Sequence, residues 1–314
     1  MNGCTHEQGV FGWQAVAEAV EFACLTELGV MKPGNVSVHG GGQGKTAEDF
    51  MRSARAITPE LSRQGSSVGE RILNAVRSTR REVDCNTNLG IVLLCAPLAH
   101  AALQLAHGQS LRQSLRTTLR GLDRRDTQRC FEAIRLARPG GLGVVQQYDV
   151  AEKEPRIGLL QAMAAAAVRD RIARQYVTDF EDVFEIAVPH LQAESERLQS
   201  CEHATMTTYL YLLGAIPDTH IQREFDRHVA NSVCRKAKQL YVEYVAPQMQ
   251  ENRLFSRLSE FDKELKRKGI NPGTTADMTV AALMVLHLQN RQEVTGSLLV
   301  NGPGSAQCAD PVFF

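Results

Sequence analysis

Apolar residues recur at steps of three and four along most of this chain. The clearest runs are Trp13, Val16, Ala17, Val20, Cys24 and Leu28, then Leu111, Leu115, Leu119 and Leu122, and later Ala281, Met284, Val285 and Leu288. These steps place side chains on one face of an α-helix, whereas strands alternate with a period of two. Long alternating runs are absent, and only Ser297–Val300 suggests a short strand. The pattern predicts an all-α protein of roughly ten to a dozen helices.

Proline, glycine and polar clusters interrupt the helical pattern at several places. The expected breaks lie near residues 29–46, 57–66, 139–156, 199–203, 216–221 and 269–274. No Gly/Ser/Pro-rich linker divides the 314 residues, so we expect one domain, residues 1–314. We expect residues 301–314 to form a loose tail or to dock on a neighbour in a homodimer.

The charge balance restricts the classes of partner. Lys plus Arg and Asp plus Glu number 35 each, which argues against binding to nucleic acid or to an anionic membrane. Any anion site must therefore be local. The arginines between residues 108 and 129 are expected to form a basic stripe on a solvated helix face, with a subunit or nucleic-acid contact as the alternative.

Other features indicate a cytoplasmic protein. The eight cysteines are scattered without a Cys-x-x-Cys pair, as expected for reduced thiols. The N-terminus lacks the regions of a signal peptide. The longest apolar run, Leu89–Leu105, contains polar residues and is short for a bilayer span, so we expect a buried helix and no membrane partner.

Three polar turns precede apolar helices: Lys32–Ser37, Asn86–Gly90 and Asn271–Asp277. A helix N-terminus offers unpaired N–H groups and a positive dipole end, so it can hold phosphate. Each turn alone resembles an ordinary helix cap. Together they predict a site for a polyanionic ligand at which the turns converge.

The order of these motifs, with Pro217–His220 between the second and the third, resembles the triphosphoribosyl-dephospho-CoA synthase family. Members of that family make the prosthetic-group precursor of citrate lyase and malonate decarboxylase. The resemblance extends from about Glu18 to about Leu288 and covers nearly the whole chain.

The sequence departs from the citrate lyase branch of that family at two motifs. There the middle motif reads Asn-Thr-His-Lys-Gly and the last reads Pro-Gly-Gly-x-Ala-Asp. Here Asn88 and Leu89 replace the His-Lys pair, and Thr274 replaces a glycine. This version resembles a divergent branch associated with archaea and with bacteria that use tetrahydromethanopterin-linked one-carbon metabolism.

The resemblance implies transfer of the 5-triphosphoribosyl group of ATP to a ribose hydroxyl of dephospho-CoA, with release of adenine and with Mg²⁺ on the triphosphate. The loss of the basic pair leaves the acceptor open. One alternative is ribosyl or phosphoribosyl transfer, from ATP or phosphoribosyl pyrophosphate, to a pterin-linked alcohol. Another is a helical nucleotide-binding regulator without catalysis.

Such chemistry needs carboxylates, a proton-transfer group and cations. Glu27, Asp182 and Asp277 are the candidate catalytic carboxylates and Mg²⁺ ligands, although Asp277 could also be a helix cap. Asp182 is expected to share a helix face with Asp179, itself a candidate N-cap. His220, in a polar turn, is the candidate acid or base, or the donor to the departing base.

The candidate substrate- and phosphate-binding residues come from the same motifs and from a basic helix face. They are Lys32, Gly34, Asn35, Arg77, Arg80, Asn86, Thr87, Asn88, Asp218, Thr274 and Thr275. The glycine-rich segments His39–Lys45 and Pro139–Gly143 are expected to close over the ligand, the second being equally compatible with a helix stop. A P-loop is excluded for the first, because His39 occupies a required glycine position and no strand precedes it.

Overall fold

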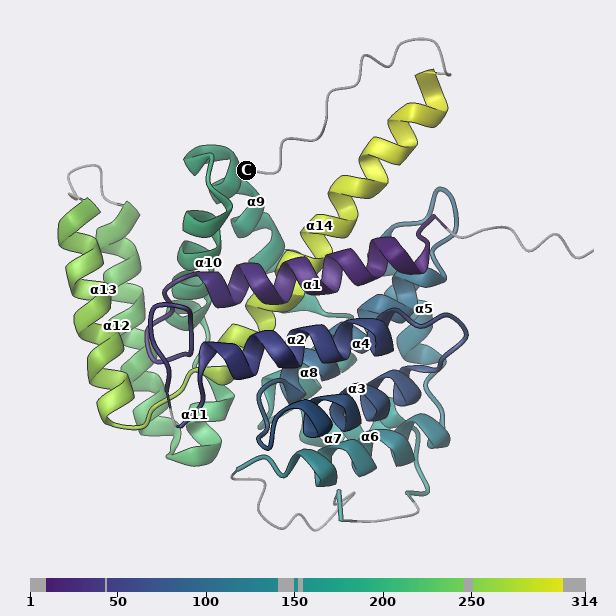
Figure 1. Ribbon diagram of the computed structural model, residues 1–314, viewed down its shortest axis with the longest axis horizontal. Coiled ribbons are helices and arrows are strands. Elements are labelled where there is room, and N and C mark those ends of the chain that lie inside the picture. The colour runs from purple at the N-terminus through teal and green to yellow at the C-terminus, as the bar shows by residue number, and fades with distance from the viewer. Residues whose placement is uncertain (1–9, 43, 141–149, 152–154, 246–250, 302–314) are drawn as a thin grey trace, which may run out of the picture.

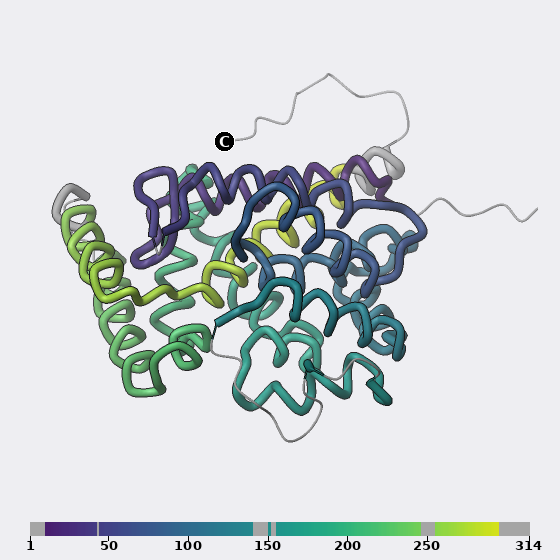
Figure 2. Tube along the Cα trace, turned by 60° about the horizontal axis from the view of Figure 1, so that its bottom comes forward, coloured from purple at the N-terminus to yellow at the C-terminus, as the bar shows by residue number. Residues whose placement is uncertain are grey.

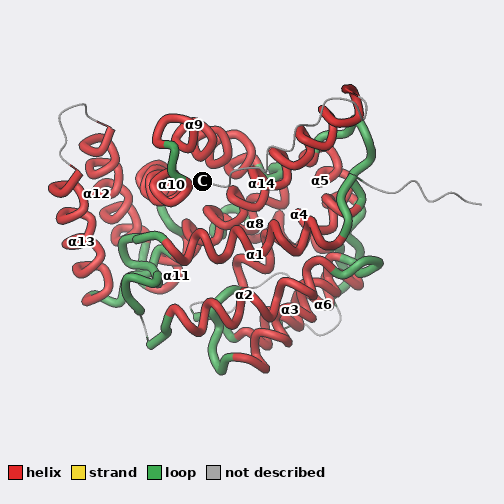
Figure 3. Tube along the Cα trace, turned by 45° about the horizontal axis from the view of Figure 1, so that its top comes forward, coloured by secondary structure: helices red, strands yellow, loops and turns green. Residues whose placement is uncertain are grey.

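The computed structural model describes residues 10–42, 44–140, 150–151, 155–245 and 251–301. Within these ranges the chain forms fourteen α-helices and one π-helix joined by loops, with two isolated β-bridges and no strand (Figure 3). The all-α prediction is confirmed, and the helices are more numerous than expected. Their bounds are α1 Trp13–Gly29, α2 Ala47–Ser62, α3 Val68–Glu82, α4 Leu89–Leu103, α5 Leu111–Arg120, α6 Arg124–Ala137, α7 Leu159–Ala166, α8 Arg171–Val177, η1 Asp182–Ala187, α9 Val188–Leu198, α10 Cys201–Ala215, α11 Thr219–Glu224, α12 Arg227–Val245, α13 Glu251–Arg267 and α14 Gly273–Asn301.

Helix α14 begins in the centre of the molecule between other helices, and its C-terminal end projects beyond them (Figures 1 and 2). It packs against α1, α4, η1, α9 and α10. Its central part and α4 are apolar on all sides, which is the pattern of a buried helix. Within the described ranges, no helix is both long and apolar enough to cross a bilayer.

Helices α2, α3 and α6 form an outer layer with one apolar face each. Thr46, Ser67 and Asp123 begin these helices with capping boxes, which fix their first residues. The predicted break at 57–66 is too early, because α2 continues through Pro59 to Ser62. Loss of one backbone N–H inside a helix that is packed on α1 and α3 does not end it.

A second apolar cluster lies beside the main core and joins α10 to α13. It contains Tyr209, Leu213, Leu240 and Phe261, all nearly inaccessible to solvent. Helices α12 and α13 form a hairpin at one side of the molecule (Figure 1). This cluster fixes the loop before α14 through Ile270.

Two expectations about local structure are wrong. The backbone at Ser297–Val300 belongs to α14, so the helical pattern overrides the local strand preference there. The basic stripe is not continuous, because α5 and α6 are separate helices, although Arg116, Arg120, Arg124 and Arg125 are exposed to solvent as expected. Its arginines form ion pairs: Arg112 with Glu185, Arg116 with Asp179 and Arg129 with Glu70. The expected tail beyond residue 301 lies outside the described residues.

Candidate functional site

One cavity of about 890 Å³ is lined by residues from all four polar motifs. They are Asn35, Asn86 to Asn88, His220, and Asn271 with Thr274 and Asp277. Glu27 from α1 and Lys45 from the glycine-rich loop complete the polar wall. The motifs therefore meet at one place, as expected for a shared ligand site.

Direct contacts join the first motif to the last. The Asn35 Nδ2 donates to Asn271 Oδ1 at 2.8 Å, across 236 positions of sequence. Gly34 has a left-handed φ of 83°, and a β-carbon there would come within 2.8 Å of Pro272. Its N–H donates to Asp262. Gly34 is required for this close packing and does not line the cavity.

Lys32 holds the same loop from the inside. Its side chain is fully buried, and Nζ donates to the carbonyls of Glu27, Val30 and Val36 at 2.5, 3.4 and 3.1 Å. It also lies 3.2 Å from Glu27 Oε1. Burial lowers the Lys32 pKa and raises the Glu27 pKa, and the ion pair opposes both shifts. Lys32 is therefore outside the cavity, whereas Glu27 lines it.

Asp277 lies in the first part of α14 and faces the start of α4. A β-carbon on Gly90 would come within 2.5 Å of its Cγ, so the carboxylate packs against the glycine backbone. No hydrogen bond to this carboxylate is found within the described residues. Burial raises the pKa of Asp277 well above its usual value, and the charge of Glu27 raises it further. The geometry does not support the interpretation of Asp277 as a cap.

Asp218 takes the capping role instead. One oxygen accepts from the N–H groups of His220 and Ile221 in α11, and the other accepts from the N–H and hydroxyl of Thr275 in α14. Burial raises the Asp218 pKa, and these hydrogen bonds oppose the shift. Asp218 and Thr275 are thus buried behind the cavity and orient His220 and Thr274, which line it.

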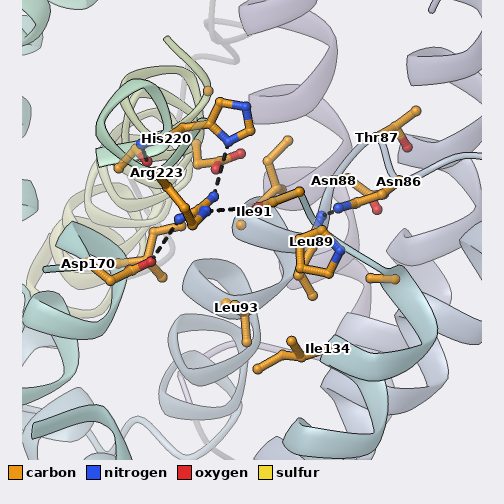
Figure 4. Close-up of a pocket in the computed structure, with 18 of the residues that line it drawn as sticks. Asn86, Thr87, Asn88, Leu89, Ile91, Leu93, Ile134, Asp170, His220 and Arg223 are labelled. Atoms are coloured by element: carbon orange, nitrogen blue, oxygen red, sulfur yellow. Dashed lines mark hydrogen bonds and ion pairs between the residues drawn. The ribbon is translucent and has the colours of Figure 1, made fainter. Parts of the chain in front are cut away.

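His220 is part of a chain of polar contacts on one wall (Figure 4). Arg223 Nη2 lies 3.1 Å from His220 Nδ1, and Nη1 lies 3.1 Å from Asp170 Oδ2. Arg223 Nε donates to the Gly140 carbonyl. Burial and the charge of Arg223 lower the pKa of His220 to about 4, so its imidazole is neutral at pH 7.

The opposite wall is the Asn86–Gly90 motif (Figure 4). Asn86 caps α4 by accepting from the Leu89 N–H, and Thr87 shares a hydrogen bond with Ser53. Asn88 Oδ1 accepts from Thr79, but its Nδ2 is buried without a partner within the described residues. That amide is a donor available to a ligand.

Within the described ranges, five cationic side chains line the cavity: Lys45, Arg80, Arg138, Arg169 and Arg223. Lys45 Nζ donates to the Asn86 carbonyl at 2.7 Å, and Arg80 pairs with Asp84, whose side chain is fully exposed. The Arg80–Asp84 pair is a weak competitor for a phosphate, because exposed ion pairs contribute little. The arginine Arg77, in contrast, pairs with Glu132 and lies outside this cavity.

An apolar wall closes one part of the cavity. It contains Leu89, Leu93, Phe131, Ile134 and Met163. Polar groups at one end and aliphatic or aromatic side chains at the other are typical of sites that bind organic molecules with a charged part.

Asp182 does not take part in this site. Its carboxylate accepts two bonds from Arg171, at 2.6 Å each, and one from Gln175 at 2.5 Å. It begins a π-helix, and Asp179 precedes it with a left-handed φ of 52°. The two carboxylates therefore do not share the face of a regular helix, and Asp179 is not an N-cap.

The expected three-carboxylate metal set is not assembled. No group of three His, Cys, Asp or Glu side chains suited to a metal ion occurs in the described part of the chain. Glu27 and Asp277 do line the same cavity, and Glu27 Oε1 is buried with the Lys32 ammonium 3.2 Å away. Two carboxylates suit Mg²⁺, which commonly takes one or two together with waters and substrate phosphates.

Several residues of the cavity were not indicated by any pattern in the sequence. Arg223 and Asp170 are 53 positions apart, and no local pattern indicates their pairing. Gly90 stands in the Asn86–Gly90 motif with a helical conformation, so the need for a glycine comes from its close neighbours Asp277 and Ile172. The glycine-rich loop His39–Lys45 contributes Lys45 to the cavity, and its closure over a ligand stays a prediction. Residues 141–143 of the second loop lie outside the described residues.

Comparisons with known proteins agree with the expected family. A family model for ATP:dephospho-CoA triphosphoribosyl transferase matches residues 13–295. A crystal structure of a candidate triphosphoribosyl-dephospho-CoA synthase from Archaeoglobus fulgidus matches with a TM-score of 0.57 and 24% sequence identity, over 74% of this chain and 96% of that one. At this identity the match establishes the shared fold. A comparison with proteins of curated function finds no match.

Proposed function

This chain belongs to the ATP:dephospho-CoA triphosphoribosyl transferase family, and from that membership we propose that it transfers the 5-triphosphoribosyl group of ATP to a hydroxyl acceptor, with release of adenine. The first acceptor to test is the ribose of dephospho-CoA. The observation that carries the proposal is the convergence of the four motifs on one cavity that presents carboxylates and cations together.

The proposed reaction is a substitution at the anomeric carbon of the ATP ribose. The bond from this carbon to the adenine nitrogen breaks, and a bond to the acceptor oxygen forms. Its transition state has oxocarbenium character, so a nearby carboxylate stabilises it. Asp277 and Glu27 supply that negative charge, because both line the cavity.

The triphosphate needs positive charge on the same wall. Lys45 and Arg80 provide it beside Asn86, and the unpartnered Asn88 amide adds a neutral donor. Glu27 and Asp277 are the residues that would hold Mg²⁺. The ion would neutralise phosphate charge when it is bound with ATP.

A second acceptor class is favoured by the apolar wall of the cavity. Leu89 lines the cavity beside Leu93 and Ile134. A diphosphate would bind better to a more basic surface than this apolar one. An acceptor with a larger apolar part and fewer charges, such as a pterin-linked alcohol, fits this composition. We propose it as the alternative to dephospho-CoA.

The test measures free adenine released from ATP plus Mg²⁺ with each acceptor in turn, and pyrophosphate released from phosphoribosyl pyrophosphate. We expect adenine release that depends on one acceptor and stops when Mg²⁺ is chelated. ATP binding that EDTA leaves unchanged would contradict the metal assignment. Tight ATP binding without transfer to any acceptor would favour a nucleotide-binding regulator.

A further inference from the structure

The contacts of His220 determine which of its nitrogens carries the proton. Arg223 Nη2 lies 3.1 Å from Nδ1, and a guanidinium can only donate hydrogen bonds. Nδ1 must therefore be the acceptor, and the proton of the neutral ring must be on Nε2. The described contacts of His220 thus define a single tautomer.

Arg223 is held firmly enough to impose that tautomer. Its three nitrogens each have a separate acceptor: His220 Nδ1, Asp170 Oδ2 and the Gly140 carbonyl. The side chain is about one fifth exposed, at 22%. A rotation that freed Nδ1 would break the other two contacts.

The Nε2–H group lies close to Glu224. Nε2 is buried and has no hydrogen-bond partner within the described residues, and Glu224 Oε1 lies 3.7 Å away. Glu224 lines the cavity. Its Oε1 is so close to Gly140 that a β-carbon there would come within 2.5 Å. One oxygen of the Glu224 carboxylate therefore lies between His220 and the Gly140 backbone, and the side chain is 29% exposed.

We propose that Arg223 and His220 are positioning residues for Glu224, and that Glu224 is the carboxylate that receives the acceptor proton in the proposed transfer. This role rests on the proposed function. His220 donates through Nε2 and does not act as the base, because its other nitrogen is occupied by Arg223. Catalytic hydrogen bonds are often long without substrate and shorten when it binds.

The proposed step balances in atoms and electrons. The acceptor hydroxyl gives its proton to Glu224 as its oxygen bonds to the anomeric carbon of the ribose. The electron pair of the broken carbon–nitrogen bond leaves with adenine. Adenine then takes up the proton that Glu224 releases, so the carboxylate returns to its initial state. No oxidant or further reactant is needed.

The neighbouring charges agree with this assignment. Arg223 and Lys45 both lower the pKa of His220, and burial lowers it most. Glu224 Oε1 lies 3.7 Å from Nε2, while Asp170 forms an ion pair with Arg223. Asp218 contacts the backbone of His220 and not its ring.

The tautomer is tested without substrate, by long-range ¹H–¹⁵N spectra of histidine-labelled protein, with His220→Gln for assignment. We expect the neutral Nε2–H form at pH 7 in the wild type and in Glu224→Gln. Arg223→Met should give mixed tautomers, whereas Arg223→Lys keeps a donor and should retain the pure form. Arg227→Gln removes an exposed charge nearby and is the control. A protonated or Nδ1–H ring in the wild type would overturn the proposal.

The role of Glu224 is tested by turnover. Glu224→Gln should lower kcat about a hundredfold with little change in KM, as for loss of a general base. Glu260→Gln, an exposed position in α13, is the matched control. Wild-type turnover in Glu224→Gln would overturn the assignment to Glu224. Absence of adenine release in the wild type would instead count against the proposed function, and the spectra would still report the tautomer.

Discussion

The carboxylate of Asp277 lies directly on the backbone of Gly90, close enough that a β-carbon on Gly90 would be 2.5 Å from Asp277 Cγ. This contact joins α14 to the start of α4. It explains why a glycine follows Asn88 and Leu89, and it predicts that stability and chemistry are both sensitive at this point.

We expect Gly90→Ala to lower the free energy of unfolding by about 2 kcal/mol, because the added methyl group displaces Asp277 and Ile172. Adenine release should fall with it. Gly29→Ala is the matched control, since a β-carbon there has no neighbour within 4 Å. Thermal unfolding of both variants measures the difference. Equal stability of the two variants would mean that the contact between Gly90 and Asp277 can relax to admit a methyl group.

Asp277→Asn should separate stability from activity. The native pKa of Asp277 is raised, so the folded protein binds more protons than the unfolded chain, and stability falls as pH rises through this range. Removal of the ionisable group should therefore raise the melting temperature at pH 7 without ATP and Mg²⁺. Turnover should drop about a hundredfold.

The comparison for Asp277→Asn is Glu260→Gln, which removes an exposed carboxylate and should change neither property. Unfolding curves at pH 5 and pH 8 test the sign, because the stabilisation by Asp277→Asn should be larger at pH 8. A variant that melts earlier than the wild type at pH 8 would show that the carboxylate stabilises the fold.

The pKa of His220 predicts a second, opposite dependence. It is lowered to about 4, so the unfolded chain binds more protons than the native state below pH 6.5. Stability should decline from pH 6.5 toward pH 4, by at most about 3 kcal/mol from this residue. His220→Gln should flatten that part of the curve. Denaturant unfolding at several pH values measures it, and identical slopes for both proteins would exclude the effect.

Asp218 should contribute more to the free energy of unfolding than an ordinary helix cap does. Asp218→Ala leaves donors from α11 and α14 unsatisfied in a buried place, at a cost of about 3 kcal/mol or more. Asp123→Ala removes the exposed cap of α6 alone and should cost about 1 kcal/mol. Urea denaturation compares the two. A similar loss in both would show that the bond to α14 contributes little.

Lys32 and Lys45 should behave differently. Lys32→Met leaves Glu27 buried without its cation and should destabilise the fold by about 3 kcal/mol. Lys45→Met should leave stability nearly unchanged and weaken ATP binding about tenfold, since Lys45 lines the cavity. Thermal unfolding and calorimetric titration with MgATP separate the two effects. Normal folding of Lys32→Met would remove its structural role.

The fold class was predictable because helical periodicity is a local property of the sequence. The apolar run that forms α4 was correctly interpreted as buried, since its composition excludes solvent on every side. Pro59 misled the prediction of a boundary, because packing of α2 on its neighbours overrides the missing hydrogen bond.

The part of the site that is formed by short motifs of consecutive residues was predictable. Asn88 and Asp277 stand in such motifs and line the cavity. Lys32 also stands in one, but the carbonyls that surround it arise from the bend of the loop, which the sequence does not reveal. Arg223 was missed because its partner Asp170, which begins α8, is 53 positions away in the sequence.

The central position of α14 has a consequence for synthesis on the ribosome. The chain emerges from its N-terminus, and domains form as their segments become available. The faces of α1 and α4 that contact α14 have no partner until α14, Gly273–Asn301, has left the ribosome. Glu27 and Gly90 likewise lack their neighbour Asp277 until α14 has been synthesised. A nascent chain that stalls before α14 therefore exposes apolar surface and has no complete cavity, which makes it a target for chaperones.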